Sequence, residues 1–231
     1  MHILATTSSS LDDLIEPVDL NQSPADVVVL SFSGSDLNGI AAGWSDGKAS
    51  LCLTNISDLR HPMSVDLWLE KTAAHARFIL VRILGGYDRW AYGADQLSRL
   101  AKRKKIPLAM LPGECSISDD RLAAASTVPD ATLMDVLAFF REGGPDNMQL
   151  LARRLDALAS GDTQSLPTAT PMPKRGFYKP GHGISTADEL TAGFPPHAQR
   201  LPILFYRSTL LANDAAPIDA MFEALAARGF A

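Results

Sequence analysis

The feature that most constrains the fold is a series of short apolar runs in which hydrophobic residues follow one another without polar alternation. Asp26–Ser33 reads DVVVLSFS, and Arg77–Ile83 reads RFILVRI. A β-strand with two apolar faces needs a covering layer on each of them, as in a parallel sheet flanked by helices. The predicted strands are Asp26–Ser33, Ser50–Thr54, Arg77–Ile83 and Pro107–Leu111, with Ile3–Thr6 as a further first strand.

Amphipathic helix patterns lie between these runs. Ser64 is the predicted N-cap of a helix that places Val65, Trp68 and Leu69 on one face, and Tyr87–Lys105 carries another apolar stripe. Strands that alternate with helices in this way predict an α/β fold. Residues 1–112 are therefore expected to form an open, mainly parallel sheet with flanking helices.

Residues 113–160 are predicted to form a helical extension, because helix patterns follow one another there without an intervening strand. Two stripes with helical spacing are formed by Leu133, Val136, Leu137 and Phe140 and by Leu151, Leu155 and Leu158. Between the stripes, Gly143, Gly144 and Pro145 predict the end of one helix and the start of the next. The pattern indicates an appended helical hairpin.

The last third of the chain has a different composition. Residues 161–200 contain six prolines among Thr, Ser and Gly without a sustained period, which predicts a Pro/Gly-rich linker or functional loop. Pro202–Arg207 (PILFYR) predicts a strand, and Pro217 opens a predicted helix. Residues 201–231 therefore resemble the start of a second α/β unit, truncated within a larger protein. In the alternative interpretation, this last strand joins the first sheet.

Composition excludes several classes of protein. The chain has 21 Lys and Arg against 26 Asp and Glu, a formal net charge of −5, which argues against bulk binding of nucleic acid. No run reaches the roughly 18 apolar residues of a membrane span, and the N-terminus lacks a secretory signal, so a cytoplasmic location away from the membrane is expected. Cys52 and Cys115 belong to no CxxC pair, and each is expected to be a buried, reduced thiol.

Several motifs with functional associations fail on their spacing. Gly43–Ala49 (GWSDGKA) has too few residues between its glycines for a phosphate loop and lacks the Ser or Thr after the lysine, so it predicts a turn. Ser33–Gly39 lacks the order of dinucleotide-binding glycines, and Asp36 is interpreted as a helix cap. The five histidines show no spacing typical of a metal site, so no metal ligand is assigned.

The first candidates for substrate binding lie in Ile83–Trp90 (ILGGYDRW), where the carboxyl end of a predicted strand meets a helix. Parallel sheets bind ligands at this edge. Tyr87 and Trp90 would offer an aromatic surface to a flat ligand, and Arg82 or Arg89 would meet its carboxylates. In the alternative interpretation, the two glycines form a turn and Trp90 packs on the sheet.

Further candidates lie in the last third of the chain. Tyr206, Arg207 and Ser208 stand at the end of the strand predicted at 202–207, where Arg207 and Ser208 would project toward an anionic group held between the two α/β units. His182 lies between glycines in KPGHG, which lets the backbone approach a ligand closely. A flexible loop histidine is the alternative for His182.

Several of these segments, taken in order, carry a resemblance to a known family. The matching stretches are Met1–Thr7, Ala25–Ser31, Arg82–Leu97, Leu111–Glu114, Leu122–Pro129, Phe139–Asn147 and Ile203–Leu225. They resemble the N-terminal region of the CobN-type large subunit of aerobic cobaltochelatases, a relative of the magnesium chelatase H subunit. The blocks RILGGYDRW and FFREGGPDN are much more specific than a lone glycine motif, and together the stretches span nearly the whole chain.

The resemblance implies a very large subunit that binds a tetrapyrrole. In aerobic cobalamin biosynthesis this subunit inserts Co²⁺ into hydrogenobyrinic acid a,c-diamide, while AAA+ partner subunits of the CobS/CobT type hydrolyse ATP. The resemblance places the metal-transferring His and Glu residues outside this chain, so no catalytic residue is assigned here. The chain itself is expected to bind no cofactor, with Co²⁺ and ATP used by the full complex.

Two other functions remain open at this point. One is a magnesium chelatase H-type subunit that inserts Mg²⁺ into protoporphyrin IX. The other is a stand-alone α/β binding or scaffold module whose ligand site is the same carboxyl edge of the sheet.

Overall fold

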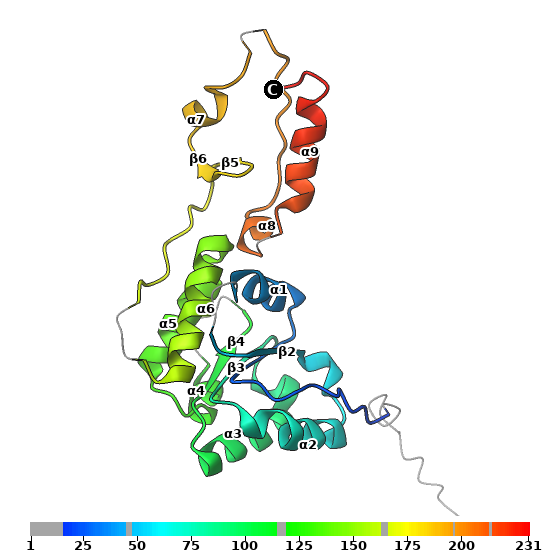
Figure 1. The fold of residues 1–231 in the computed structure, drawn as a ribbon, viewed down its shortest axis with the longest axis vertical. Coiled ribbons are helices and arrows are strands. Elements are labelled where there is room, and N and C mark those ends of the chain that lie inside the picture. Colours follow the sequence, from blue (N-terminus) through cyan, green and yellow to red (C-terminus); the bar gives the residue numbers. More distant parts are fainter. Residues whose placement is uncertain (1–15, 45–47, 115–118, 163–165, 196, 213) are drawn as a thin grey trace, which may run out of the picture.

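The computed structural model describes residues 16–44, 48–114, 119–162, 166–195, 197–212 and 214–231. The chain forms two parts that are stacked along the long axis of the molecule (Figure 1). The head, residues 16–162, contains the parallel sheet, and the arm, residues 174–231, projects from one end of the head; residues 166–173 form the connecting segment. The strand predicted at Ile3–Thr6 and the thiol of Cys115 lie outside the described residues.

The head is built on a four-stranded sheet in the order β2-β1-β3-β4, and all of its strands run parallel. The strands are β1 (Val27–Ser31), β2 (Leu51–Asn55), β3 (Phe78–Ile83) and β4 (Leu108–Pro112). Every residue of β1, β3 and β4 is buried, whereas burial alternates along β2 at one edge. The α/β fold and the parallel sheet predicted from the apolar runs are confirmed.

Helices cover both faces of the sheet. Buried residues of α2, α3 and α4 pack on one face, and those of α1, α5 and α6 pack on the other (Figure 1). The predicted helical hairpin is formed by α5 and α6, which meet at Gly143 and complete the second helix layer. The head helices are α1 (Gly34–Gly43), α2 (Pro62–Lys71), α3 (Ala91–Lys104), α4 (Asp120–Ala125), α5 (Asp130–Glu142) and α6 (Gly144–Ser160), with the 3-10 turns η3 (Ile56–Asp58), η4 (Ala73–His75) and η5 (Tyr87–Trp90).

The outer edge of β4 is closed by side chains. The Leu108 N–H donates to Thr127 Oγ1 at 2.7 Å, and the Met110 N–H donates to Ser126 Oγ at 2.9 Å. The Thr127 N–H in turn donates to the Leu108 carbonyl oxygen at 2.9 Å. An edge strand with unpaired backbone groups invites another strand to pair with it. Ser126 and Thr127 occupy these groups and prevent such pairing.

Two predicted helix caps are wrong. His61, not Ser64, caps α2, and its Nδ1 accepts a backbone N–H of the first turn at 3.1 Å. Ser64 is buried within the helix, and its hydroxyl accepts a backbone N–H from the N-terminal segment at 2.8 Å. Ser33 caps α1 by accepting the N–H of Asp36, whose carboxylate has a different role. Because Pro62 occupies the first position of α2, that helix starts earlier than its apolar stripe.

The arm contains less regular structure. An antiparallel hairpin of β5 (Phe177–Lys179) and β6 (Gly183–Ser185) lies within the region predicted as a linker, followed by α7 (Ala187–Thr191). The prediction of a strand at Pro202–Arg207 is wrong. Residues 202–206 pair with no strand in the described part of the chain, and α8 (Arg207–Leu211) begins at the last residue of the predicted strand. The helix predicted from Pro217 is confirmed as α9 (Ala216–Ala226).

Burial separates the two parts of the molecule. The buried hydrophobic residues all lie between residues 25 and 159, and no described residue from 160 onward is buried. The head therefore has its own hydrophobic core, whereas the described arm has none. The domain boundaries at residues 112, 160 and 200 stay predictions. No described helix is long and apolar enough to cross a membrane.

Candidate functional site

The carboxyl ends of β1 and β3 form the edge at which the strand order reverses. The chain passes from β1 to β2 on one side, whereas β3 lies on the other side of β1. Open parallel sheets bind ligands outside the carboxyl ends of their strands at such a point. Here Arg82 of β3 and Asp36 of α1 form an ion pair of 2.6 Å, with 8% and 15% of their side chains exposed. An internal ion pair therefore fills the crevice.

Arg82 connects several elements at this edge. Its Nη2 donates to the Gly113 carbonyl at 2.8 Å, and its guanidinium carbon lies 4.1 Å from the ring centre of Phe140 on α5. Asp36 also accepts the hydroxyl of Ser31 at 2.7 Å. The expectation that Arg82 meets ligand carboxylates is wrong, because its guanidinium is buried against the protein's own carboxylate. Asp36 is the partner of that guanidinium and not a helix cap.

Trp90 is part of the core. Only 6% of it is exposed, and its indole N–H donates to the Leu59 carbonyl at 2.9 Å. A Cβ placed on Gly93 would lie 2.0 Å from the indole ring, so the ring packs directly on the backbone of α3. This burial favours the alternative, in which Trp90 packs on the sheet, and ligand binding by Trp90 stays a prediction.

Tyr87 and Arg89 remain partly or fully exposed at the carboxyl edge. The Tyr87 hydroxyl donates to Asp95, and the guanidinium of Arg121 lies 4.3 Å from the ring centre of Tyr87. Burial, followed by the hydrogen bond to Asp95, raises the pKa of Tyr87. Arg89 lies 5.9 Å from the ring of Phe32, which follows β1. Arg121 covers one face of the Tyr87 ring, and ligand binding by Tyr87 and Arg89 stays a prediction.

Helix α8 of the arm reaches the carboxyl edge of the head. A pocket of about 220 Å³ lies between the two parts and includes Ser208. Its other lining residues are Ser35, Asp36, Phe140 and Met148 of the head and Leu211 and Ala212 of the arm. Ser208 was expected at the end of a strand, whereas it lies in α8. It nevertheless faces the carboxyl edge that the sequence analysis singled out.

A glycine turn between α5 and α6 lets the arm approach the head. Gly143 and Gly144 have φ values of 58° and 83°, in the left-handed region that favours glycine. A Cβ on Gly143 would lie 2.7 Å from the Leu211 carbonyl oxygen, and one on Gly144 would lie 2.4 Å from the methyl group of Met172. Gly143 is thus required by contact with the backbone of the arm as well as by its conformation, whereas Gly144 is required by its backbone conformation.

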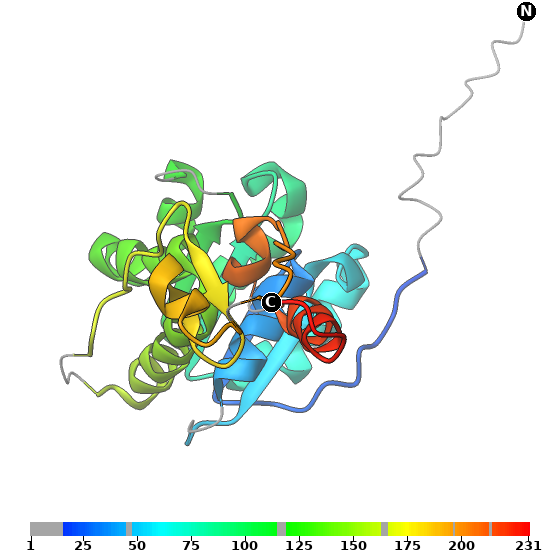
Figure 2. The same cartoon turned by 90° about the horizontal axis from the view of Figure 1, so that it is seen from above.

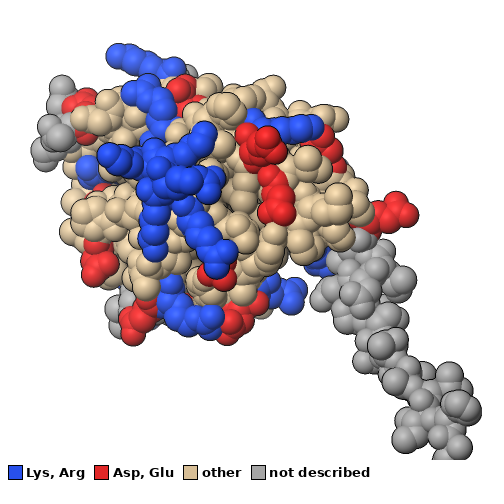
Figure 3. Space-filling view, turned by 90° about the horizontal axis from the view of Figure 1, so that it is seen from below, with Lys and Arg blue, Asp and Glu red and all other residues tan. Residues whose placement is uncertain are grey.

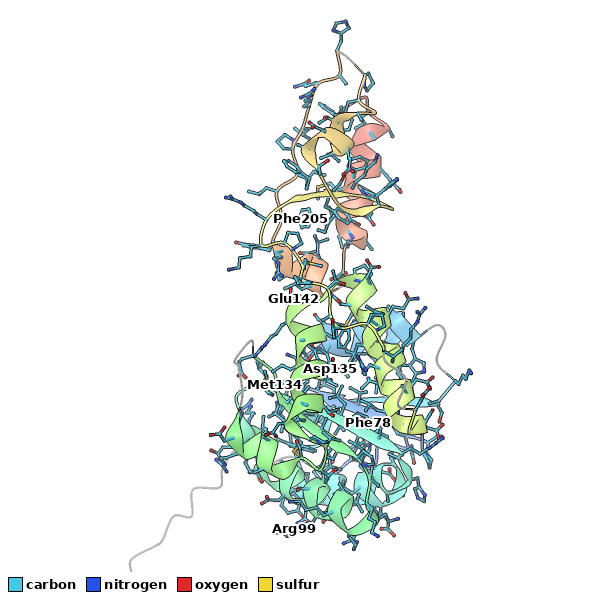
Figure 4. The ribbon with its side chains drawn as sticks, turned by 90° about the vertical axis from the view of Figure 1, so that its left-hand side faces the viewer. Phe78, Arg99, Met134, Asp135, Glu142 and Phe205 are labelled. Carbon is cyan, nitrogen blue, oxygen red and sulfur yellow. The ribbon has the colours of Figure 1, made fainter. Side chains whose placement is uncertain are left out.

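Glu142 and Arg207 clamp the connecting segment beside this turn. The Met172 N–H donates to Glu142 Oε2 at 2.8 Å, and Arg207 donates to the carbonyl groups of Met172 and Pro173 at 2.9 and 3.0 Å. Arg207 Nη2 also lies 3.7 Å from Glu142 Oε2. Figure 4 shows Glu142 at the top of the head, below Phe205 of the arm. Arg207 begins α8 and does not end a strand, and its guanidinium binds the chain itself, whereas its contact with a ligand stays a prediction.

Asn147 fixes the connecting segment from the other side. Its buried side-chain amide donates to the carbonyl groups of Gly143 and Thr170 at 2.8 and 2.9 Å. Its Oδ1 accepts the Thr170 N–H at 2.8 Å. The amide therefore makes three short hydrogen bonds, of which the two to Thr170 join the first turn of α6 to the connecting segment. Glu142, the glycines and Asn147 all lie in the block FFREGGPDN, which forms the joint between head and arm.

A larger pocket of about 640 Å³, here called the joint pocket, opens beside this joint. It lies between the glycine turn, the connecting segment, the β5-β6 hairpin and α8 to α9. Its polar lining residues include Asp146, Asn147, Thr170, Tyr178, His182 and Asp219, and its apolar lining residues include Pro171, Met172, Ile184, Leu210 and Ala215. His182 is exposed at this pocket, with its Nδ1 3.4 Å from the Pro180 carbonyl oxygen.

Tyr178 and Asp219 form a polar pair in the joint pocket. The Tyr178 hydroxyl donates to Asp219 at 2.8 Å, and its ring meets Phe205 edge to face at 5.9 Å. Burial, followed by the hydrogen bond and the charge of Asp219, raises the pKa of Tyr178 to about 12. Tyr178 is therefore a neutral hydrogen-bond donor at neutral pH. The sequence analysis missed this pair, and only Asp219 falls within a resembling block, Ile203–Leu225.

The joint pocket has the properties of a site for an organic ligand. Ligand sites commonly measure about 300–1,000 Å³ and combine apolar walls with a few polar groups. Among the predicted residues, His182 lines this pocket, whereas Tyr87 and Arg89 lie at the edge of the sheet and Tyr206 points outward. In the described ranges, no group of three or more His, Cys, Asp or Glu residues could hold a metal ion.

A positive patch lies on the face of the head away from the arm (Figure 3). It is formed around the end of α3, where basic residues complement the negative end of the helix dipole. The exposed cations there are Arg99, Lys102, Arg103, Lys104 and Lys105. This patch does not contribute to either pocket.

The fold and the joint define an α/β protein in two parts, with a pocket of ligand size where the parts meet. A family model described as CobN/Magnesium Chelatase matches residues 137–231, which include the joint and the whole arm. The chain is 35% identical to the aerobic cobaltochelatase subunit CobN of Sinorhizobium sp. and 32% identical to that of Pseudomonas aeruginosa, over 99% of its length in each case. Residues 137–231 therefore carry a CobN/Magnesium Chelatase domain, and the whole chain is similar to part of these CobN subunits.

The solved catalytic subunit of cobaltochelatase from Mycobacterium tuberculosis has the same fold. It superposes with a TM-score of 0.65 over 88% of this chain and 15% of that one, at 23% identity. The matches cover 19% and 18% of the Sinorhizobium and Pseudomonas relatives. The chain thus spans about a fifth of the length of the curated relatives it matches.

Proposed function

We propose that this chain serves as part of the large subunit of an aerobic cobaltochelatase. The subunit would hold hydrogenobyrinic acid a,c-diamide in the cytoplasm while Co²⁺ is inserted, with ATP hydrolysed by AAA+ partners of the CobS/CobT type. The observation that carries the proposal is the 35% identity to the aerobic cobaltochelatase subunit CobN of Sinorhizobium sp. across 99% of the chain. The family domain at residues 137–231 supports it, because this domain contains the joint pocket.

The proposed role of the joint pocket is to hold one edge of the tetrapyrrole. The macrocycle has an apolar body and a polar periphery, which the pocket's mixed lining suits. Pro171, Met172 and Ile184 would contact the ring, while His182 and Thr170 would meet its amide or carboxylate side groups. Holding the ring by one edge leaves its centre open to the metal.

The chemistry of insertion is assigned to residues outside those described here. Two pyrrolic protons must leave the ring, which requires a base, and the metal must lose its water before it reaches the nitrogens. The joint pocket offers Tyr178, but its hydroxyl is already bound to Asp219 and its pKa is raised to about 12. We therefore assign this chain a substrate-holding role and no catalytic residue.

The proposal is tested first by binding. The purified chain is titrated with hydrogenobyrinic acid a,c-diamide, and the absorbance of the ligand is followed, because Trp68 and Trp90 are buried in the head and report poorly on the joint pocket. Ile184→Asp is expected to weaken binding at least about tenfold by placing a charge in an apolar wall. Lys102→Ala on the distant α3 is the control and should leave the affinity unchanged. Absence of binding at high micromolar ligand contradicts the substrate-holding role.

Activity is tested in a chimera in which this chain replaces the matched stretch of the Sinorhizobium sp. subunit. With the AAA+ partners and ATP, the chimera is expected to insert Co²⁺. A chimera that is active without binding by the isolated chain would favour a scaffold role. The magnesium alternative has one specific support, since the family model covers both chelatases. Preference for Mg²⁺ and protoporphyrin IX in the same assay would replace the cobalt proposal.

A further inference from the structure

The arm exposes much apolar surface. Six of the eleven large hydrophobic side chains exposed among the described residues lie between residues 177 and 221. Leu204 is 99% exposed and Tyr206 is 85% exposed. Helix α9 has Ile218, Met221 and Phe222 in sequence positions typical of an apolar face, yet none of its residues is buried. Leu204 and Tyr206, two residues apart, thus expose apolar surface of a kind that marks interaction sites where it forms a patch.

Residues 202–206, here called the open segment, also leave backbone groups unpaired. The segment runs along the arm toward α8 (Figures 1 and 2). Among the hydrogen bonds of the described residues, none involves the backbone N–H or C=O of Ile203, Leu204 or Phe205. Just before it, the Leu201 N–H donates to the Ala231 carbonyl at 2.8 Å, so backbone pairing stops at the start of the open segment.

Side chains in the open segment alternate as in a strand. Phe205 turns inward to meet Tyr178 at 5.9 Å, whereas Leu204 and Tyr206 on either side of it point outward. The composition is β-branched and aromatic, as strands favour. The head shows the contrast, since its β4 edge is closed by Ser126 and Thr127. The open segment has no such closure and keeps both a free backbone edge and an apolar outer face.

We infer that the open segment is a docking edge for a β-strand supplied by further polypeptide of a CobN-type large subunit. The inference rests on the proposed function, and the length of the relatives supports this occupant. About four-fifths of each curated relative lies outside the match, as does most of the solved subunit. Strand addition pairs the free N–H and C=O groups of residues 203–205 that point toward the docked strand, and it places apolar side chains beside Leu204 and Tyr206. The docked strand thereby supplies the arm with a core that its described residues do not form.

Hydrogen exchange followed by mass spectrometry tests the inference on two proteins. One is the 231-residue chain alone, and the other is the chimera that carries this chain within the Sinorhizobium sp. subunit. Among residues 203–206, the amides that point toward the docked strand are expected to exchange almost unprotected in the chain alone and at least about 100-fold more slowly in the chimera. The amides of β3, which lie in the core of the head, should be protected equally in both and serve as the internal standard.

Paired variants identify the contact. Leu204→Asp in the chimera is expected to reduce the protection of residues 203–206 at least about tenfold, because a carboxylate cannot be buried under the docked strand. Met134→Asp is the matched control, since Met134 is also exposed but lies on α5 of the head. This control should leave the protection unchanged. Equal loss in both variants would contradict a docking edge at Leu204.

Several outcomes overturn the inference. The first is rapid exchange of residues 203–206 in a chimera whose β3 is protected. Protection that grows with the concentration of the chain alone would identify a second copy as the occupant, and protection that appears only with AAA+ subunits would identify those subunits. If β3 is unprotected in the chimera, hydrogen exchange is compared instead between the unaltered Sinorhizobium sp. subunit and the isolated stretch of that subunit that matches this chain. Equal exchange of the aligned peptide in those two proteins also overturns the inference.

The inference and the proposed function fail in different ways. A chimera that inserts Co²⁺ but leaves residues 203–206 unprotected contradicts the docking edge alone. A chimera that protects these residues but neither binds the tetrapyrrole nor inserts a metal contradicts the proposed function alone.

Discussion

Replacing Gly143 with alanine tests how the arm is held on the head. Gly143 has φ 58° and ψ −164°, a combination that costs a residue with a Cβ roughly 1–3 kcal/mol. The new Cβ would also lie 2.7 Å from the carbonyl oxygen of Leu211 and 2.8 Å from its Cα, both backbone atoms of α8. Helix α8 must therefore move away. This movement separates Arg207 from Met172, and a hydrogen bond to a charged group is worth about 1.5–3 kcal/mol.

Gly161→Ala provides the matched control. Gly161 also has a positive φ, 68°, but a Cβ there would meet nothing within 4 Å. Its substitution should cost only the backbone strain of a left-handed residue, about 1–2 kcal/mol. Both variants are expected to lower the unfolding free energy of the head, measured by urea denaturation with tryptophan fluorescence. Gly143→Ala alone should speed the hydrogen exchange of the Met172 amide, which donates to Glu142 at 2.8 Å in the wild type.

The reasoning is refuted by equal exchange of the Met172 amide in the two variants, because the contact with α8 would then have no effect beyond backbone strain. It is also refuted if Gly143→Ala leaves the unfolding free energy of the head unchanged. Either result would mean that the glycine turn does not fix the position of the arm.

Three further predictions concern single contacts. Arg82→Leu should lower the free energy of unfolding in urea by roughly 3–5 kcal/mol, because it leaves the Asp36 carboxylate buried without its partner. The double variant with Asp36→Asn should recover part of that loss. Additive losses in the double variant would contradict coupling between the two residues. Trp90→Ala should lower the free energy of unfolding by about 3–5 kcal/mol and leave the affinity for the tetrapyrrole unchanged. Weakened binding without loss of stability would identify Trp90 as a ligand-binding residue. The pKa of Tyr178 is raised to about 12 in the folded state from the ordinary tyrosine value of 10.0, so its contribution to stability is present below pH 10 and is lost as the pH rises through 12. Thermal unfolding of wild type and Tyr178→Phe should therefore converge across this window, and a constant difference would contradict the pKa assignment.

The fold of the head could be predicted because the sequence patterns that specify it lie within single strands, helices and turns. A strand buried on both faces must be apolar at every position, and the residues of β1 and β3 show this directly in the sequence. The turn at Gly143 was predicted for the same reason, since a glycine pair followed by proline ends one helix and starts another. The residues that cap α1 and α2 were not predicted, because a single hydrogen bond decides which residue caps a helix. Ser33 and His61 compete for that role with other polar residues nearby.

The candidate site could be predicted only in part. The joint forms between residues far apart in the sequence, such as Asn147 and Thr170 or Tyr178 and Asp219, and no local pattern reports such pairs. The burial of Trp90 could not be predicted, because an aromatic stripe has the same spacing whether it is buried or exposed. His182 was recognised because its flanking glycines are a local signal, and the structure places it at the joint pocket.

The error at Pro202–Arg207 has a different cause. The pattern PILFYR meets the local requirements of a strand, and Phe205 and Leu204 do face opposite ways. A strand is defined by its ladder, however, and the described residues offer this segment no neighbour. The local preference and the structure are reconciled if the ladder partner belongs to another stretch of polypeptide, which is the inference drawn for the open segment.

The position of the glycine turn links these observations to function. Gly143 and Gly144 stand between a head whose core is complete and an arm that reaches outward with an uncovered apolar edge. Because the joint pocket is bounded by both parts, a change in the angle of the arm alters the pocket and the direction of the open segment together. A docked strand would fix that angle and therefore the shape of the pocket. Substitutions at the glycine turn are thus expected to impair metal insertion in the chimera even though no residue of the turn reacts with the tetrapyrrole.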